Sequence, residues 1–280
     1  MVSVYLNGRL GNQLFQYVSL RIVAEKYSTN FYIPKNVDES ITFYKKITNI
    51  LFINLELPVE TNPHYWIGCD IFDINFGYDD GSICKISNEC NSLDEHQDGS
   101  FLYGFFQNEK NLKDRRSDIK KWLCVKNDIL NDKCNHILEK YNPNNYCYIH
   151  FRGGDYKSID KYFLPLTYYT RSMDKMKSDY PNIKFLIITD DIETSRELFK
   201  NYDIDSISNE MCIDFYLLYK SVYSIIPNSS FSWWGIWLSD SNIRNLAPYG
   251  WFNYNDCGDF EPKYIKSDRF EYVKNEKYEL

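Results

Sequence analysis

The stretch from Tyr146 to Tyr156 carries three side chains of different chemistry at close spacing. His150 can donate or accept a proton, Arg152 presents a planar fork of hydrogen-bond donors, and Asp155 is an acceptor. A guanidinium pairs well with phosphate oxygens, and the two glycines after the arginine let a ligand approach the backbone closely. The stretch therefore predicts a diphosphate-binding site. The alternative is an ordinary turn with a surface Arg-Asp pair.

The composition predicts a folded protein with a large core. Of 280 residues, 44% are hydrophobic and 18% aromatic, which suffices for one large domain or two smaller ones. The net charge of -7 disfavours a nucleic acid as partner. No apolar run has the roughly 18 residues of a membrane span, and the eight cysteines show no CxxC pair. We therefore expect a soluble, cytoplasmic protein with no integral membrane segment.

The second half of the chain alternates short apolar strands with helices. This alternation predicts right-handed βαβ units and a parallel sheet. A strand is expected at the start of 146–156, with others at 185–189, 204–207 and 223–226. Helices are expected at 165–180, 193–201, 214–220 and from 229 onward. Ligands of such sheets bind beyond the carboxyl ends of the strands, so those ends are the place to look for a site.

Three of these strand ends carry polar clusters, namely His150/Arg152/Asp155, Thr189/Asp190/Asp191 and Asn228/Ser229/Ser230. The serines lie at the start of a helix, where backbone N-H groups and the helix dipole attract anions; Ser229 could equally be a simple N-cap. Asp214 lies at the start of another helix. Its carboxylate could cap that helix or accept hydrogen bonds from the edge of a guanine. The nearby Trp233, Trp234 and Trp237 fit a core stripe better than a sugar-stacking surface.

The first half opens with a strand at 2–6, a glycine turn and a helix, as nucleotide-binding α/β folds do, but without a P-loop or a dinucleotide fingerprint. Further strands are expected at 31–33 and 101–106, and helices at 113–125 and 127–140. Four turn-forming residues at 142–145 then predict a linker. We therefore place an N-terminal domain at residues 1–142 and a C-terminal domain at 143–280.

Five sequence blocks together resemble the alpha-1,2-fucosyltransferase family. The order and spacing of the blocks agree with the family as well. They read GRLGNQLFQY (Gly8 to Tyr17), HFRGGDY (His150 to Tyr156), ITDDI (Ile188 to Ile192), NSSFSWWGIWL (Asn228 to Leu238) and APYGW (Ala247 to Trp251).

The resemblance implies a GT-B-like α/β fold, in which two Rossmann-like domains face each other across a cleft. The N-terminal domain would serve the acceptor and the C-terminal domain the donor. The implied reaction moves L-fucose from GDP-fucose, with inversion, to the 2-hydroxyl of a terminal sugar of a glycan, galactose being the first expectation. Apart from the donor substrate it needs no cofactor and no obligatory metal.

The resemblance also assigns roles to single residues. The guanine would meet His150 and Asp214, and the β-phosphate would meet Arg152. The rest of the implied donor-binding set is Ser229, Ser230, Phe231, Gly11, Asn12 and Gln13, of which Asn12 and Gln13 would reach the cleft from the N-terminal domain. Arg152 would stabilise the charge of the leaving diphosphate. A carboxylate must take the acceptor proton, and Asp155, Asp190 and Asp191 are equal candidates.

One position departs from the family. The central motif usually has two consecutive arginines, whereas here Gly153 follows Arg152. Arg9 and Lys157 are candidates for the missing charge. The departure leaves two alternatives open, a related transferase that uses another GDP-deoxysugar such as GDP-rhamnose, and a sugar-binding protein without turnover.

Overall fold

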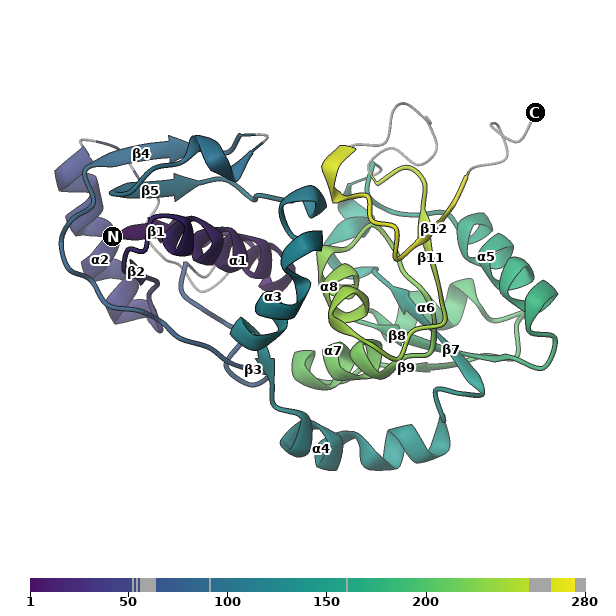
Figure 1. Cartoon of the computed structure of the whole chain (residues 1–280). Helices are drawn as coiled ribbons and strands as arrows, with labels where there is room; N and C mark the ends of the chain where they lie inside the picture. Colours follow the sequence, from purple (N-terminus) through teal and green to yellow (C-terminus); the bar gives the residue numbers. More distant parts are fainter. Residues whose placement is uncertain are drawn as a thin grey trace. The chain divides into compact units, whose positions relative to one another are not determined.

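The computed structural model describes residues 1–51, 53, 55, 64–90, 92–159, 161–251 and 263–274. The chain forms two compact units, Met1–Lys126 and Asn127–Leu280 (Figure 1). Within the described ranges, no helix is both long enough and apolar enough to cross a bilayer.

The division falls earlier in the chain than the predicted boundary between residues 142 and 143. Helix α4 (Asn127–Lys140) packs on helix α7 (Met211–Lys220), so it belongs to the second unit. The turn formers at 142–145 make a tight turn inside that unit, where the N-H of Asn145 donates to the carbonyl of Asn142 at 2.9 Å. Turn chemistry marked a real turn but not a domain boundary.

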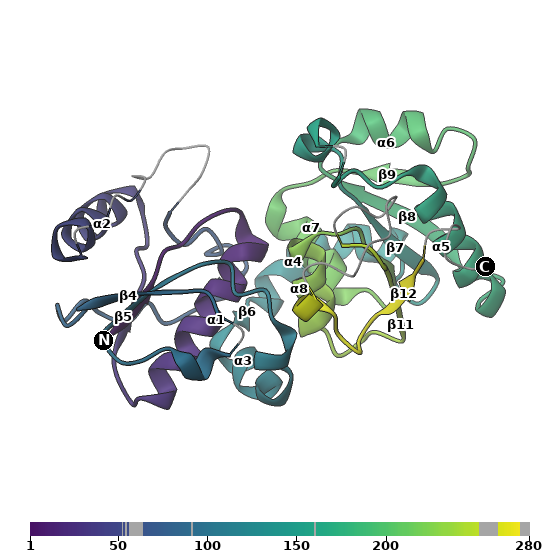
Figure 2. The same cartoon turned by 90° about the horizontal axis from the view of Figure 1, so that it is seen from above.

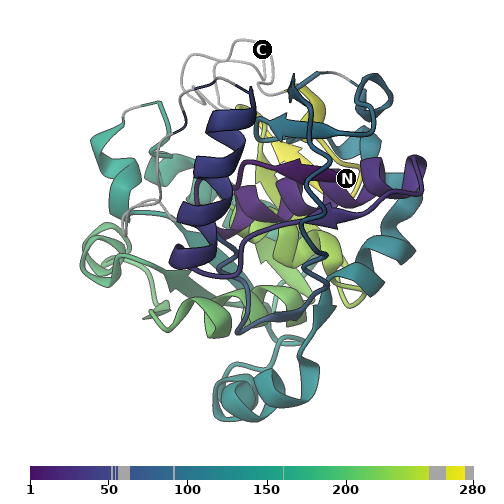
Figure 3. The ribbon, with the colours of Figure 1, turned by 90° about the vertical axis from the view of Figure 1, so that its left-hand side faces the viewer.

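The first unit is built on a four-stranded parallel sheet with the order β2-β1-β5-β4. Its strands are β1 (Val2–Val4), β2 (Phe31–Tyr32), β4 (Lys85–Asn88) and β5 (Ser100–Tyr103). Its long helices, α1 (Leu10–Lys26) and α2 (Val37–Leu51), lie on opposite faces of the sheet (Figure 2). Figure 3 looks onto α2, whose Phe43 and Tyr44 pack on Met1 and Tyr5. Because helices cover both faces of the sheet, all three residues of β1 are buried, the polar Ser3 included.

Smaller elements complete the first unit. A two-stranded antiparallel sheet joins β3 (Phe72–Asp73) to β6 (Cys124–Val125), and α3 (Arg116–Trp122) precedes β6. The 3-10 segments are η1 (Leu93–Glu95), η2 (Glu109–Asn111) and η3 (Lys113–Arg115) in this unit, and η4 (Gly154–Ser158) and η5 (Lys263–Ile265) in the second.

The second unit contains a six-stranded parallel sheet with the order β12-β11-β10-β7-β8-β9. The strands are β7 (Tyr146–Phe151), β8 (Lys184–Thr189), β9 (Asp205–Ile207), β10 (Tyr223–Ile225), β11 (Arg244–Pro248) and β12 (Glu271–Val273). The chain first runs outward from β7 to β9, then returns to add β10, β11 and β12 on the other side of β7. The strand order therefore reverses between β7 and β10, which is where doubly wound sheets open a crevice.

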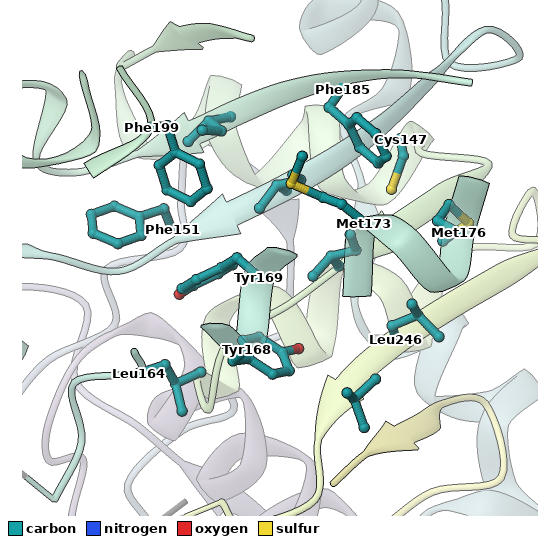
Figure 4. Close-up of a cluster of buried hydrophobic side chains, with 14 of the residues drawn as sticks. Cys147, Phe151, Leu164, Tyr168, Tyr169, Met173, Met176, Phe185, Phe199 and Leu246 are labelled. Atoms are coloured by element: carbon teal, nitrogen blue, oxygen red, sulfur yellow. The ribbon is translucent and has the colours of Figure 1, made fainter. Parts of the chain in front are cut away.

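Each face of this sheet packs on its own set of helices. Alternate residues of β7, Cys147, Ile149 and Phe151, point toward α5 (Leu166–Asp179) and the end of α6 (Ile192–Leu198). Figure 4 shows Cys147 and Phe151 in one buried cluster with Tyr169 and Met173 of α5. Ile149 belongs to the same cluster. The intervening residues face α4, α7 and α8 (Ser230–Leu238), which cover the opposite side.

The tryptophans of α8 are core residues. Trp233, Trp234 and Trp237 are at most 1% exposed, and the rings of Trp233 and Trp237 stack with their centroids 5.6 Å apart. The indole N-H of Trp233 donates to the carbonyl of Ile265 at 3.0 Å. Rings buried in this way stabilise the unit and are not a surface for stacking on a sugar.

Candidate active site

His150 lies beside the point where the strand order reverses. It is the fifth residue of β7, on the face that α7 and α8 cover, and it is 5% exposed. Its ring centroid is 5.7 Å from that of Phe231, which in turn packs against Phe215 of α7 at 5.4 Å. Among the described residues, no group hydrogen-bonds to its Nδ1 atom.

The His150 ring is neutral at physiological pH. Burial, together with the positive charge of Arg152, lowers its pKa to about 3. Removing an imidazolium from water disfavours the charged form, and a nearby cation adds to the effect. The neutral ring can still donate one hydrogen bond and accept another, which suits contact with a nucleobase.

Arg152 follows directly at the end of β7 and is fixed by two carboxylates. Its Nη2 atom donates to Asp155 Oδ1 at 2.6 Å, and its Nη1 atom donates to Asp190. The guanidinium also lies over the ring of Tyr156, 5.3 Å from the ring centroid. Its side chain is 13% exposed, so a cation is held in one orientation and largely shielded from water at the strand tip.

The two glycines after Arg152 allow close contact with the end of β8. The N-H of Gly153 donates to Asp190 Oδ1 at 3.1 Å. Any side chain at position 153 or 154 would collide with Asp191 or Asp190, because the added Cβ would come within 2.5 Å and 2.4 Å of them. The glycines thus serve packing between the tips of β7 and β8 in this structure.

Asp191 has a structural role. Its side chain caps α6 by accepting the N-H of Thr194 at 3.1 Å, and it pairs with Lys157 at 2.5 Å. The hydrogen bond from Lys157 and those from Thr194 lower the Asp191 pKa. An acid held in the ionised form by a cation and a helix N-terminus is a weak proton acceptor. Lys157, proposed from sequence as a replacement charge, is already paired with this carboxylate.

The helix α8 begins at the end of β10, as the sequence predicts. Ser229 is the N-cap residue and is 5% exposed, yet its hydroxyl makes no capping hydrogen bond. No acidic side chain occupies the first turn. The helix N-terminus, with Ser229 and Ser230, therefore keeps the polarity that favours an anion.

Asp214 lies in the first turn of α7, next to Phe215. It is 9% exposed and accepts a hydrogen bond from Asn209 Nδ2 at 2.8 Å. Burial, with a smaller contribution from the negative charge of Asp190, raises its pKa to about 7, although hydrogen bonds from Asn209 oppose this shift. A buried carboxyl with a raised pKa and few internal partners is typical of functional sites.

The remaining predicted residues lie in the first unit, in the first turn of α1. Gly11 is buried, and Asn12 Oδ1 accepts from Gln107 Nε2 at 2.8 Å. Gln13 is fully buried, and its amide bonds to the backbone on both sides of Trp66, donating to the carbonyl of Tyr65 and accepting the N-H of Ile67. Gln13 therefore fixes the 65–67 segment, and the donor-binding role of these three residues stays a prediction.

The second unit thus gathers most of the predicted set at neighbouring strand tips of one sheet. These residues are His150, Arg152, Asp155, Asp190, Asp191, Asp214, Ser229, Ser230 and Phe231. Sequence reasoning did not include Tyr156, Asn209 or Phe215, which support them. The tyrosine belongs to the central motif and the phenylalanine adjoins Asp214, so motif neighbours were the available signal. Within the described ranges, no three His, Cys, Asp or Glu side chains form a metal-binding group.

The chain resembles several known proteins along most of its length. It is 26% identical to the alpha-1,2-colitosyltransferase of Escherichia coli, covering 94% of this chain and 96% of that protein. It is 25% identical to the O-antigen biosynthesis glycosyltransferase WbnK of Escherichia coli, covering 90% and 95%. The crystal structure of POFUT1 in complex with GDP-fucose matches with a TM-score of 0.51 at 14% identity, covering 88% of this chain and 96% of that one.

These similarities fix the fold and the family. The likeness to the POFUT1 structure, with two α/β units built on parallel sheets, confirms the predicted GT-B-like fold. The model of glycosyl transferase family 11 matches residues 1–267. The chain belongs to glycosyl transferase family 11 and is a glycosyltransferase.

Proposed function

We propose that this chain transfers L-fucose from GDP-fucose to the 2-hydroxyl of a terminal sugar, galactose, of a glycan, with inversion at the anomeric carbon. The observation that carries the proposal is the grouping of Arg152, the α8 N-terminus and two guanine-compatible groups, His150 and Asp214, around the strand-order reversal. The alpha-1,2-colitosyltransferase, a relative along the full chain, supports a 1,2 linkage and a deoxysugar.

The chemistry of transfer explains why these groups are needed. The bond between the sugar C1 and the β-phosphate oxygen breaks as the acceptor oxygen bonds to C1, so negative charge develops on the departing GDP. A guanidinium and a helix N-terminus that are already oriented stabilise that charge without reorganising during the reaction. In the proposed mechanism they fill the role that a divalent cation has in other transferases, and no metal is required.

The acceptor hydroxyl must lose its proton during the transfer. Of the three candidate bases, Asp191 is the least suited, since it is 14% exposed and held by Lys157 and Thr194. Asp190 is 29% exposed and is bonded to both Arg152 and Gly153. Asp155 also pairs with Arg152, at 2.6 Å, but it is 50% exposed and is therefore the acid most open to an incoming hydroxyl. We therefore propose that Asp155 is the general base that accepts the proton of the acceptor hydroxyl.

Thermal unfolding with nucleotides tests the donor assignment. A ligand at 100 times its Kd stabilises a native protein by about 2.7 kcal/mol, which is visible as a raised Tm. GDP and GDP-fucose should raise the Tm equally well with EDTA and with Mg²⁺, while UDP and ADP should not. A shift that depends on Mg²⁺, or one produced by UDP, would overturn the assignment.

A second donor has a specific observation in its favour. A relative that matches 94% of this chain is named for colitose, which differs from fucose in lacking the 3-hydroxyl. Turnover of GDP-fucose and GDP-colitose should be compared on a galactose-terminated acceptor, with the product linkage and anomeric form read by NMR. A larger kcat/KM for GDP-colitose would make the chain a colitosyltransferase and leave the site roles unchanged.

A further inference from the structure

Asn228 is a buried residue whose side chain is not hydrogen-bonded to any part of the chain that the structure describes. It is 2% exposed, and both its Oδ1 and its Nδ2 atoms lie out of reach of solvent without a partner. A carboxamide can make up to four hydrogen bonds, and nearly all buried polar atoms in native proteins make at least one. A side chain with both ends unsatisfied needs an explanation.

A loosely placed loop does not explain it, because the backbone around Asn228 is fixed. The hydroxyl of Tyr156 donates to the carbonyl of Asn228 at 3.3 Å, and the hydroxyl of Tyr168 donates to the carbonyl of Ile226 at 2.5 Å. The N-H of Ser229 donates to the carbonyl of Pro227 at 2.8 Å. The segment between β10 and α8 is held from both sides while the amide at its centre has no internal bond.

The position of Asn228 suggests what takes up these bonds. Strands β7 and β10 pair with Ile149 opposite Ile225, so the segment after β10 lies beside the tip of β7, where His150 also has an unpartnered buried nitrogen. Asn228 directly precedes the N-terminus of α8. Tyr156, whose hydroxyl donates to the carbonyl of Asn228, also has the guanidinium of Arg152 over its ring. The amide thus lies among the groups proposed to bind the diphosphate.

We propose that Asn228 binds the donor substrate, with Nδ2 donating to a diphosphate oxygen and Oδ1 accepting from a hydroxyl next to the diphosphate. Phosphate oxygens only accept hydrogen bonds, so the carbonyl end of the amide requires a donor. In a nucleotide sugar, hydroxyls flank the diphosphate on both sides, one set on the ribose and one on the transferred sugar. This inference rests on the proposed GDP-sugar donor and adds one residue to its binding site.

The substitution Asn228→Leu separates ligand binding from stability. Leucine has a similar shape and removes two unsatisfied polar groups, so the ligand-free variant should have a Tm equal to or above that of the parent. GDP-fucose should bind about 10- to 100-fold more weakly, because the phosphate loses one hydrogen bond to a charged acceptor and the hydroxyl loses another.

A matched control is available in the same sheet. Asn245 of β11 is similarly buried, but its amide is satisfied, accepting from the Ser224 hydroxyl at 2.8 Å and donating to the carbonyl of Arg269 at 3.1 Å. The variant Asn245→Leu should lower the Tm and leave the affinity for GDP unchanged. A second variant, Asn228→Asp, keeps the shape and places a negative charge at the diphosphate, so it should also lose affinity.

Calorimetric titration of the full chain with GDP and with GDP-fucose decides the inference. Equal losses of affinity for both ligands in Asn228→Leu would place the hydroxyl on the ribose. A loss for both ligands that is larger for GDP-fucose would place it on the sugar, and a loss for GDP-fucose alone would refute the bond to the diphosphate. Parent-like affinity for both ligands in Asn228→Leu and Asn228→Asp would refute the inference while leaving the donor assignment intact. A lowered Tm with unchanged affinity would show that the amide is structural. If the parent binds neither ligand, the proposed function itself fails.

Discussion

A Cβ atom placed on Gly153 would lie 2.5 Å from the Cβ atom of Asp191, closer than two carbon atoms can pack. The φ angle of Gly153 is -96°, outside the left-handed region that favours glycine, so the contact with Asp191 gives a spatial reason for the glycine. This relationship gives a physical reason for the departure from the family pattern. The second arginine of the motif does not fit this backbone while Asp191 caps α6.

Gly153→Ala should therefore destabilise the protein by about 1–3 kcal/mol, the usual range for overpacking. Asp191→Gly should also destabilise it, since α6 loses its cap. In the double variant the added methyl group has room, so the combined loss should be smaller than the sum of the single losses. Urea unfolding of the parent and the three variants measures this coupling. Additive losses would mean that the two positions do not interact.

Arg152→Ala should lower kcat by roughly 10²- to 10³-fold, the range for losing one group that stabilises developing charge. Arg152→Lys keeps the charge but loses the planar fork that bonds to Asp155 and Asp190 from separate nitrogens, so it should recover only part of the activity. The exposed Arg196 of α6 provides a control, and Arg196→Ala should have parental kcat. Parental turnover in Arg152→Ala would remove this residue from the mechanism.

Asp214 should make GDP binding depend on pH. Its pKa of about 7 means that the ligand-free site holds a protonated carboxyl below neutrality, whereas accepting the N-H groups of guanine requires the carboxylate. The affinity for GDP should therefore fall by about tenfold for each pH unit below 7 and level off above it. Titrations between pH 5.5 and 8.5 test this. An Asp214→Asn variant that shows the same pH profile would contradict it.

The same group links stability to pH with a definite sign. The folded pKa lies above the unfolded value of about 3.9, so the native state holds the extra proton between these values. This contribution to stability is complete below about pH 4 and is lost as the pH rises through 7. Asp214→Asn should therefore be more stable than the parent at pH 8, and the difference should shrink toward pH 5.

Gln13→Glu should destabilise the first unit by about 1–3 kcal/mol. The carboxylate can still accept the N-H of Ile67, but it faces the carbonyl of Tyr65 as a second acceptor in a fully buried position. The exposed Gln97 serves as control, and Gln97→Glu should stay within about 0.5 kcal/mol of the parent. Chemical denaturation of both variants measures their free energies of unfolding. Equal stability of the two would show that the hydrogen bonds of Gln13 do not stabilise the first unit.

The sequence predicted most of the second unit, because short apolar strands alternate clearly with helices there, but it did not reveal β11 and β12. Strands β8, β9 and β10 and helices α4, α5 and α7 lie where the apolar patterns placed them. The sequence did not reveal α2, whose threonine, isoleucines and aromatic residues favour strands. An N-capping asparagine was the missed signal, since the N-H of Glu39 donates to Asn36 Oδ1 at 2.9 Å.

For the site, residue types and strand ends predicted which side chains lie near one another. They did not predict the hydrogen bonds and packing contacts of those side chains. The polar cluster after β10 was visible as Asn228, Ser229 and Ser230. That the amide of Asn228 is left without a partner depends on the rotamers and spacing of the surrounding side chains. Likewise, the sequence showed Gly153 only as a missing positive charge. Its close approach to Asp191 depends on the pairing of β7 with β8, which the sequence does not show.

The reversal of strand order between β7 and β10 has a consequence for folding. Strand β7 pairs on one side with β8, the next strand in the chain, and on the other with β10, which arrives only after β9 and α7. Pairings between distant segments carry the larger loop-closure entropy, so the β7–β8–β9 half should form first. Pulse-labelled hydrogen exchange should then protect Ile187 before Ile225. The proposed donor site would be complete only after the β7–β8–β9 half has formed, and a nascent chain could not bind nucleotide until β10 had docked.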